Sequence, residues 1–437
     1  MSWGKREHER RRPERSMLHQ AFREGWPLVV ESTRLPPRVH EEVRRFMGCG
    51  DLRRGFTVVR CDDCAESSLV AFSCKSRAWC PSCGARRAHE TALHLDEVLP
   101  RVAFRQWTLS VPFALRFLLV KEPKLLRKVE RRLVEAIFRW QRHRAKELGA
   151  RGRRVGGAVC FTQWFGSALQ LQPHLHGLVA EGVWNDGVFM ELPAPSPEDV
   201  EAVLERALAQ VLPDFESRGV AWPEDEYEAL QAKSAQLRLP LDEQAAPARR
   251  GRLAVMMGFS LHADTATGAN DRQGLLRLAR YGARGPIAES RLSRREDGRY
   301  AYETKKGVTL VLTAQQLVKR LIALMVPQGL HLNNFHGVLA PAAVARSTLA
   351  PPPSDSRRSV PVPPGKKAKR PRIDWATLLH RTFGCDVWRC SCGGQRRVVA
   401  LVTNRRTAEE MLRNMGMLAV APPLPQAPGP PQLELLQ

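Results

Sequence analysis

The sequence predicts an α+β protein in which a sheet built on an antiparallel hairpin, with amphipathic helices beside it, follows a small cysteine-rich domain. Two apolar runs, 156–164 and 172–184, are joined by a short turn containing glycine and serine, as in a hairpin. Apolar residues at three- and four-residue steps before and after these runs indicate helices. Six of the ten cysteines lie between Cys49 and Cys83, and four of them form two CxxC pairs.

The composition favours a nucleic-acid partner. The 437 residues carry a formal net charge of +23, so a polyanion is the expected partner. No apolar stretch approaches the ~18 to 20 residues that a membrane-spanning helix requires. Residues 1–15 lack the apolar segment of a secretory signal. We therefore expect a cytoplasmic protein with no membrane partner.

The cysteine spacing predicts zinc. Two CxxC pairs that lie 15 residues apart have zinc-ribbon spacing, in which four thiolates close a tetrahedral site: Cys61 with Cys64, and Cys80 with Cys83. Cys74 and Cys49 could each replace one of these four or complete a second site, and the spacing does not choose between them. Reduced structural thiols are the alternative, but they would have to reproduce two such pairs by chance.

Local patterns predict the elements of the first half of the chain. One or two helices are expected over 16–47 and a strand over 103–111. An amphipathic helix within 116–154 has an apolar face that includes Leu126 and Val129. The same segment holds fourteen Lys or Arg against four Glu, which favours contact with DNA over a solvated charged face.

The charge reverses in residues 190–246, which hold thirteen acidic and four basic residues and are predicted to be an insertion, helical from about 198 to 212. A helix over 271–284, a strand over 307–312 and a helix over 313–325 follow. The predicted domains are a basic N-terminal helical arm 1–48, a zinc-binding domain 49–95, a central domain 96–345, a Pro/Lys-rich linker 346–371, a small C-terminal domain 372–418 and a disordered tail 419–437.

The second arm of the hairpin contains two histidines separated by one apolar residue. In a strand, His174 and His176 point to the same face while Leu175 packs behind them. Imidazole binds most divalent metals, and an incomplete set of protein ligands leaves positions open for substrate oxygens. Two hydrogen-bonded structural histidines would give the same pattern.

The predicted helix 271–284 carries one of only four tyrosines. Arg277, Tyr281 and Arg284 are spaced so that the tyrosine stands between two arginines on one stripe, where the arginines could clamp a phosphate. The alternative is a core tyrosine with a satisfied hydroxyl.

These features occur together in a known family. The matching segments are CGDLRRGF at 49–56, CDDC at 61–64, FSCKSRAWCPSC at 72–83, RQWTLSVP at 105–112, QWFGSALQLQPHLH at 163–176, GFSLHA at 258–263 and RY at 280–281. By these motifs the chain resembles the rolling-circle insertion-sequence transposases of the HUH, single-tyrosine type that carry an N-terminal zinc-binding domain. The motifs cover nearly all of the chain except the insertion, the linker and the tail.

The resemblance implies an HUH nuclease core, which is an antiparallel sheet with helices on its faces. It implies single-stranded DNA at mobile-element ends as substrate, target DNA as a further partner, and action on nucleoid DNA. It assigns His174 and His176 as ligands of Mg²⁺ or Mn²⁺ and Tyr281 as the nucleophile of a 5′-phosphotyrosine intermediate. Arg277 and Arg284 would stabilise the phosphate oxygens. For the third ligand we favour Gln163, because the hairpin brings it beside the histidines, with Glu181 as the alternative.

The chain departs from the family pattern in three places. Relatives have Arg-Pro-Pro soon after the tyrosine where this chain has Arg284-Gly285-Pro286, and Tyr-His-Gly where it has Phe335-His336-Gly337. Their C-terminal CxxCGG is shortened to Cys390-Ser391-Cys392-Gly393-Gly394, which leaves open whether this motif binds metal, although His380 and Cys385 lie close.

Other functions and other tyrosines fit the sequence less well. A histidine-triad nucleotide hydrolase needs a third histidine where this chain has Leu178. A non-catalytic or degenerate zinc-containing DNA-binding protein explains the charge and the cysteines, but needs neither the histidines nor Tyr281. Tyr227 lies among acidic residues that would repel a phosphate. Tyr300 and Tyr302 lie on a polar strand after a turn that we expect to be mobile.

Overall fold

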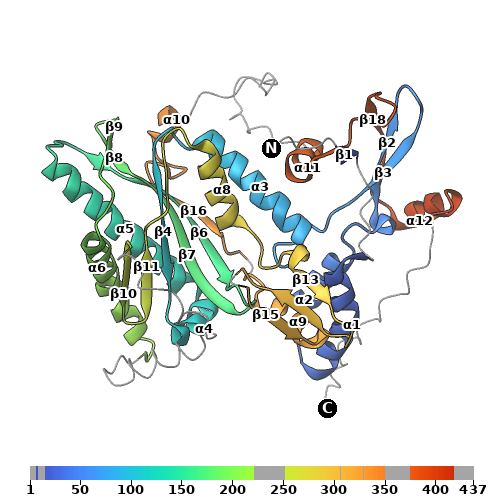
Figure 1. Ribbon diagram of the computed structural model, residues 1–437, viewed down its shortest axis with the longest axis horizontal. Helices are drawn as coiled ribbons and strands as arrows, with labels where there is room; N and C mark the ends of the chain where they lie inside the picture. The colour runs from blue at the N-terminus through green and yellow to red at the C-terminus, as the bar shows by residue number, and fades with distance from the viewer. Residues whose placement is uncertain are drawn as a thin grey trace, which may run out of the picture.

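A central antiparallel sheet organises the molecule (Figure 1). The computed structural model describes residues 6–7, 15–220, 251–305, 307–327, 329–349 and 375–417. The strand order is β10-β11-β4-β7-β6-β16, and β12 also pairs with β4. These strands are β10 (Leu253–Met256), β11 (Phe259–His262), β4 (Phe104–Ser110), β7 (Leu171–Ala180), β6 (Gly157–Phe165), β16 (Asn333–Gly337) and β12 (Ala266–Thr267). The predicted hairpin is β6 and β7, at the middle of the sheet.

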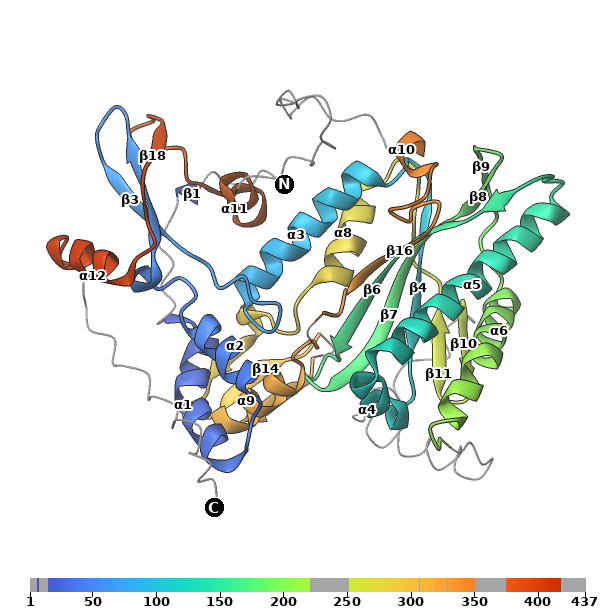
Figure 2. The same ribbon diagram turned by 180° about the vertical axis from the view of Figure 1, so that it is seen from behind.

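Helices cover both faces of this sheet (Figures 1 and 2). On one face lie α5 (Pro123–Glu147) and α6 (Pro197–Glu216), whose apolar side chains share a core with Trp107 and Leu175. On the other face lie α3 (Pro81–Val98) and α8 (Arg272–Ala283), packed against Phe161. The predicted α+β class, with an antiparallel sheet, helices on its faces and a cysteine cluster before it, is confirmed.

The basic helix expected within 116–154 is two helices. The first, α4 (Phe113–Lys121), ends at Glu122, and α5 starts at Pro123. Proline has no N–H to donate, so it is favoured at the first position of a helix and here separates the two. Leu126 and Val129 of α5 are buried as predicted, because they lie on the face that packs on the sheet.

Of the segment 190–246, predicted to be an acidic insertion that is helical from about 198 to 212, the structure describes residues 190–220, and the helix is present as α6. Ser196 caps α6 with a capping box, and Val200 and Leu204 are completely buried in the core that α5 and the sheet share. The acidic residues lie mainly on the opposite, solvent-facing side, so α6 is an amphipathic helix with a buried apolar face. The remainder, 221–246, lies outside the described residues.

A second lobe contains the N-terminal helices. It consists of α1 (Met17–Ser32), α2 (Pro37–Met47), α9 (Ala314–Ala323) and the sheet of β13 (Leu292–Arg294), β14 (Tyr300–Glu303) and β15 (Thr309–Leu312). Phe22, Phe46 and Trp79 form the centre of its core. A Cβ atom on Gly25 of α1 would lie 2.5 Å from the backbone of Ala314, so glycine permits these helices to touch.

The C-terminal unit and the zinc-binding domain, predicted to be separate, form one structure. Strand β18 (Arg396–Val402) pairs with β2 (Phe56–Cys61), which pairs with β3 (Ser67–Ala71). Both ribbon views show these red and blue elements side by side. The pairing of β18 with β2 could not be predicted from the sequence, because two strands so far apart in the chain share no local sequence pattern. The helices α11 (Trp375–Phe383) and α12 (Arg405–Asn414) flank this sheet.

Short elements complete the described chain. They are β1 (Arg6–Glu7), β5 (Arg154–Val155), β8 (Gly182–Asn185), β9 (Val188–Glu191), β17 (Cys385–Asp386) and α10 (Arg346–Leu349), with 3-10 turns at Leu52–Arg54 and Glu289–Arg291. Most of the predicted linker and all of the predicted tail lie outside the described residues. No helix in the described ranges combines the length and the apolar character needed to cross a membrane.

Candidate active site

The two histidines lie on β7, on the face of the sheet that α8 covers. His176 is opposite Thr108 of β4 and Phe161 of β6, and His174 is opposite Gln163. Because alternate residues of a strand share a face, the two imidazole rings come together, with centroids 4.8 Å apart.

Hydrogen bonds orient both imidazoles through Nδ1. His174 Nδ1 donates to the carbonyl oxygen of Gln172 at 2.8 Å, and His176 Nδ1 is bonded to Oγ1 of Thr108 at 3.1 Å. This leaves Nε2 of each ring for another partner. Burial lowers the pKa of His176 to about 3, with smaller contributions from His174 and Arg284, and it also lowers the pKa of His174. Both rings are therefore held neutral, the form that binds a metal.

Gln163 is directly opposite His174, as the hairpin predicted. Its Nε2 donates to the carbonyl oxygens of Tyr281 and Gly282, at 2.6 and 3.0 Å. Gln163 Oε1 and His176 Nε2 are both buried and accept no hydrogen bond from the described residues. Two buried acceptors without donors on one face fit a cation, because leaving such atoms unsatisfied costs about 1–3 kcal/mol each.

The alternative prediction, that Glu181 is the third metal ligand, is wrong. It follows the end of β7 that lies away from His174, and it accepts a hydrogen bond from Arg105 Nε at 2.7 Å. This ion pair is largely buried, so the Glu181 carboxylate is already neutralised at the opposite end of the strand.

Tyr281 lies on α8 above the histidines. Its ring centroid is 5.4 Å from that of His176. A Cβ atom on Gly282 would lie 2.7 Å from the Phe161 ring, so only glycine lets this turn of α8 rest directly on β6. The bonds from Gln163 to the last turn of α8 hold it there as well. The tyrosine is thus supported by a rigid helix against the sheet.

Two cations contact the Tyr281 ring, but only one is a predicted arginine. The guanidinium of Arg284 is 4.7 Å and Nζ of Lys305 is 4.3 Å from the ring centroid. The prediction that Arg277 flanks the tyrosine is wrong, because Arg277 is 66% exposed and pairs with Asp271 at 3.9 Å near the start of α8. Lys305 was missed as a site residue since it follows β14, and no local pattern links it to α8.

The competing tyrosines are core residues. Tyr300 and Tyr302 are buried in the second lobe, so the prediction that they lie on a polar strand is wrong. The Tyr300 hydroxyl donates to Glu24 at 3.0 Å, and burial together with this carboxylate raises the pKa of Tyr300. Tyr227 lies outside the described residues.

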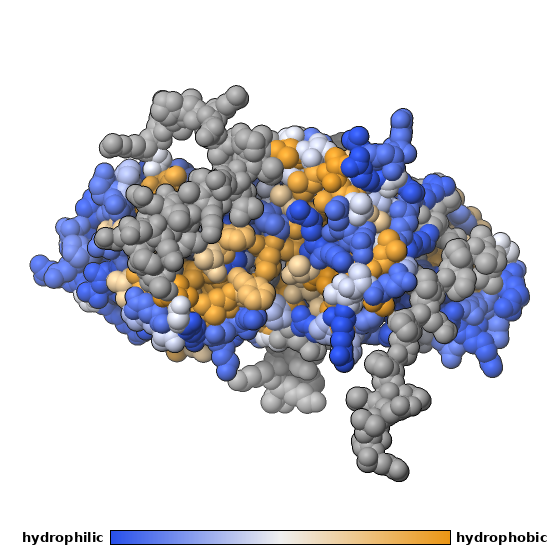
Figure 3. Space-filling view, turned by 90° about the horizontal axis from the view of Figure 1, so that it is seen from below, coloured by the Kyte–Doolittle hydropathy of each residue, from blue (hydrophilic) through white to orange (hydrophobic). Residues whose placement is uncertain are grey.

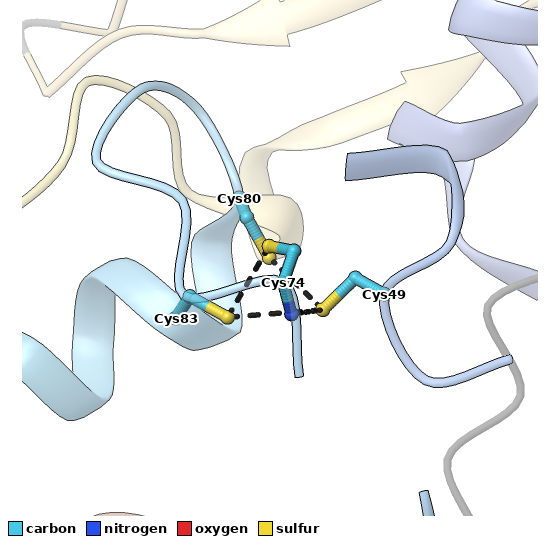
Figure 4. Close-up of side chains that lie close together, drawn as sticks. All are labelled: Cys49, Cys74, Cys80 and Cys83. Atoms are coloured by element: carbon cyan, nitrogen blue, oxygen red, sulfur yellow. Dashed lines mark hydrogen bonds between the residues drawn. The ribbon is translucent and has the colours of Figure 1, made fainter. Parts of the chain in front are cut away.

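The cysteines form two clusters, so the prediction that the two CxxC pairs share one ion is wrong. The first cluster is Cys49, Cys74, Cys80 and Cys83, drawn in Figure 4, with Sγ atoms 3.7 Å apart for Cys49 and Cys83 and 3.5 Å apart for Cys74 and Cys83. The side chains come from the end of α2, a loop and the start of α3, and they point toward one another.

Gly84, just after this cluster, approaches Gly285, which follows α8 and Arg284.

The second cluster unites distant cysteines: Cys61, Cys64, Cys390 and Cys392. The shortened C-terminal motif thus completes the CxxC of the N-terminal domain. Sequence spacing could not reveal these groupings. In the first cluster, Cys61 and Cys64 lie between Cys49 and the other three ligands, and in the second cluster most of the chain lies between the two pairs.

In a comparison with known protein families, two parts of the chain match family models. Residues 21–111 match the family described as "Transposase zinc-binding domain" and residues 157–347 match the family described as "Putative transposase". The first span contains the whole first cluster, which supports zinc as its ion, and the second contains both histidines and Tyr281. Neither a curated protein nor a solved structure matches the chain.

Proposed function

Because the chain is a transposase of the insertion-sequence type with an N-terminal zinc-binding domain, we propose that it cleaves and rejoins single-stranded DNA through a covalent 5′-phosphotyrosine at Tyr281. The observation that carries this proposal is the half-buried Tyr281 ring, held between His176 and two cations. A DNA-binding protein without catalysis has no need of a tyrosine placed beside buried imidazoles.

The proposed reaction is an exchange of phosphate esters. The phenol oxygen of Tyr281 loses its proton and attacks the phosphorus, the bond from phosphorus to the 3′ oxygen breaks, and the leaving 3′ oxygen takes up a proton. Rejoining reverses these steps with another 3′ hydroxyl, so no nucleotide cofactor is needed. Arg284 and Lys305, which lie over the Tyr281 ring, would neutralise the non-bridging phosphate oxygens.

His174, His176 and Gln163 fit a divalent ion. Their Nε2 and Oε1 atoms are a neutral, partly oxygen-donor set, and Mg²⁺ or Mn²⁺ retains open positions on such a set. When bound there, the ion would supply Lewis-acid polarisation of the scissile phosphate. The chain's own part is to keep both imidazoles neutral and to fix the Gln163 amide through the backbone of α8.

The surface of α4 supports single strands as the substrate class. Phe113 and Phe117 are 48% and 62% exposed, and Arg116 and Lys121 lie over their rings at 5.3 and 4.5 Å. Arg116 also contributes to the lowered pKa of His174, which places α4 beside the site. Figure 3, which views the end of the molecule where α4 lies, shows apolar residues gathered among hydrophilic ones. Exposed aromatic rings with nearby cations are typical of surfaces that stack unpaired bases.

The substrate class is testable with the wild-type protein. Labelled single strands from the element's ends, incubated in Mg²⁺, are expected to give an adduct that survives denaturing electrophoresis, whereas the same ends as closed duplex give none. Tight binding of single strands without any adduct would favour the non-catalytic DNA-binding alternative.

We expect Phe117→Ala to weaken binding of single-stranded DNA. Loss of one stacked base costs about 1–3 kcal/mol, roughly 5- to 150-fold in Kd. Fluorescence anisotropy with a labelled oligonucleotide measures this change, and Phe117→Trp should restore affinity. Val188→Ala, a change at an exposed apolar residue of β9, is the matched control. If Phe117→Ala and the control bound single-stranded DNA with equal affinity, the proposal that α4 is part of the binding surface would be wrong.

A further inference from the structure

We propose that the second cluster, Cys61, Cys64, Cys390 and Cys392, binds its own zinc ion, and that this ion fastens the C-terminal unit 375–417 to the N-terminal domain. The C-terminal unit lies outside both spans that match family models, residues 21–111 and 157–347. The proposal concerns the architecture of the chain and is independent of the proposed reaction.

The positions of the sulfur atoms fit a tetrahedral thiolate site. Sγ of Cys61 is 3.6 Å from Sγ of Cys392, and Sγ of Cys64 is 3.6 Å from Sγ of Cys390, while all four lie within 4.8 Å of one another. With Zn–S bonds of about 2.3 Å, tetrahedral geometry separates the sulfurs by roughly 3.8 Å. All four are free thiols, and a disulfide would need a sulfur separation of about 2.05 Å.

A tight turn makes the one-residue spacing of Cys390 and Cys392 suitable for this geometry. Gly393 N donates to Cys390 O at 3.0 Å, Cys390 N donates to Gly394 O at 2.9 Å, and Gly393 has a φ of +92°. A Cβ atom on Gly394 would lie 2.8 Å from Cys61 Sγ and 2.3 Å from a carboxylate oxygen of Asp63. The two glycines therefore let the C-terminal turn approach the N-terminal CxxC.

One buried arginine and two carboxylates lie beside the cluster. Four thiolates around Zn²⁺ carry a net charge of −2. Arg396, whose side chain is 1% exposed, is paired with Cys61 in the sheet and lies 3.5 Å from Glu66. The Cys390 thiol donates to the same Glu66 carboxylate at 3.2 Å. Metal binding would release the thiol proton to solvent and leave Glu66 with Arg396.

The sheet and the cluster support the same connection. β18 pairs with β2 over most of its length, and the ligands lie where β2 ends and β18 begins, so the ion would lock the register of this pairing. The first cluster uses the other four N-terminal cysteines, so Cys390 and Cys392 are the thiols that complete the Cys61–Cys64 pair among the described residues.

The test is the zinc content of the full-length protein, measured by mass spectrometry of the metal after gel filtration under reducing conditions. We expect two zinc ions per chain for the wild type and one for Cys390→Ser/Cys392→Ser. Cys385→Ser, a change at the third C-terminal cysteine, should keep two. Cys392→His, which replaces one zinc ligand by another, should also keep two and guards against simple misfolding of the double variant.

Thiol alkylation provides a second measurement. Cys64 and Cys392 are exposed to solvent, so as bare thiols they would be accessible to iodoacetamide at a pH high enough to ionise them. Bound to zinc, they should be protected until a chelator is added, as peptide mapping would show. One zinc per wild-type chain, two in Cys390→Ser/Cys392→Ser, or rapid alkylation of Cys64 and Cys392 in protein carrying two zinc ions would each overturn the proposal.

Discussion

Tyr281→Phe is expected to abolish the covalent DNA adduct, reducing it at least about 10³-fold to below detection, while single-stranded DNA still binds with nearly unchanged Kd. The substitution removes only the phenol oxygen that we propose as the nucleophile and leaves the ring between His176, Arg284 and Lys305. Denaturing electrophoresis of labelled oligonucleotide measures the adduct, and anisotropy measures binding.

Tyr302→Phe is the matched control for this experiment. Tyr302 is buried in the second lobe, so its variant should form the adduct at the wild-type level. Tyr300→Phe loses a hydrogen bond to the Glu24 carboxylate, worth about 1.5–3 kcal/mol of unfolding free energy, and should also retain the adduct. Peptide mapping that placed the DNA on residues 299–305 would contradict the assignment of Tyr281.

His176→Ala is expected to reduce strand cleavage by at least about 10²- to 10³-fold, the usual cost of losing one group that stabilises charge at the reacting phosphate. Affinity for DNA should change little, because the basic surface supplies it. The rate of cleavage in Mg²⁺ and the Kd are measured on the same oligonucleotide.

The control for this variant is His143→Ala, since His143 lies exposed on α5 and pairs only with Glu147 among the described residues. Thr108→Val tests the orientation of the imidazole, because it removes the hydroxyl that His176 Nδ1 contacts, and should lower the rate less than His176→Ala does. Wild-type cleavage by His176→Ala would exclude the metal site.

The parts of the site that sequence could predict are those fixed by strand alternation and hairpin register. His174 and His176 share a face because two residues is the period of a strand, and Gln163 faces His174 because the turn is short. The burial of Leu126 and Val129 likewise followed from helical spacing.

The parts that sequence could not predict depend on contacts between distant segments. Lys305 reaches Tyr281 because the second lobe packs beside α8, and Arg277 is exposed and pairs with Asp271. The partners of Cys61 and Cys64 are in the C-terminal unit. The burial of one face of α6 could not be predicted from its acidic composition, because net charge reflects the residues on the solvent-facing side of a helix.

The pairing of β2 with β18 has a consequence for synthesis of the chain. Cys61 and Cys392 are 331 residues apart, so at about 5–20 residues per second β18 emerges from the ribosome roughly 15 to 65 s after β2. During that interval one edge of β2 has unpaired N–H and C=O groups, and an open edge can pair with another chain. A nascent chain, or one truncated before β18, therefore exposes an edge of β2 that β18 covers in the full chain.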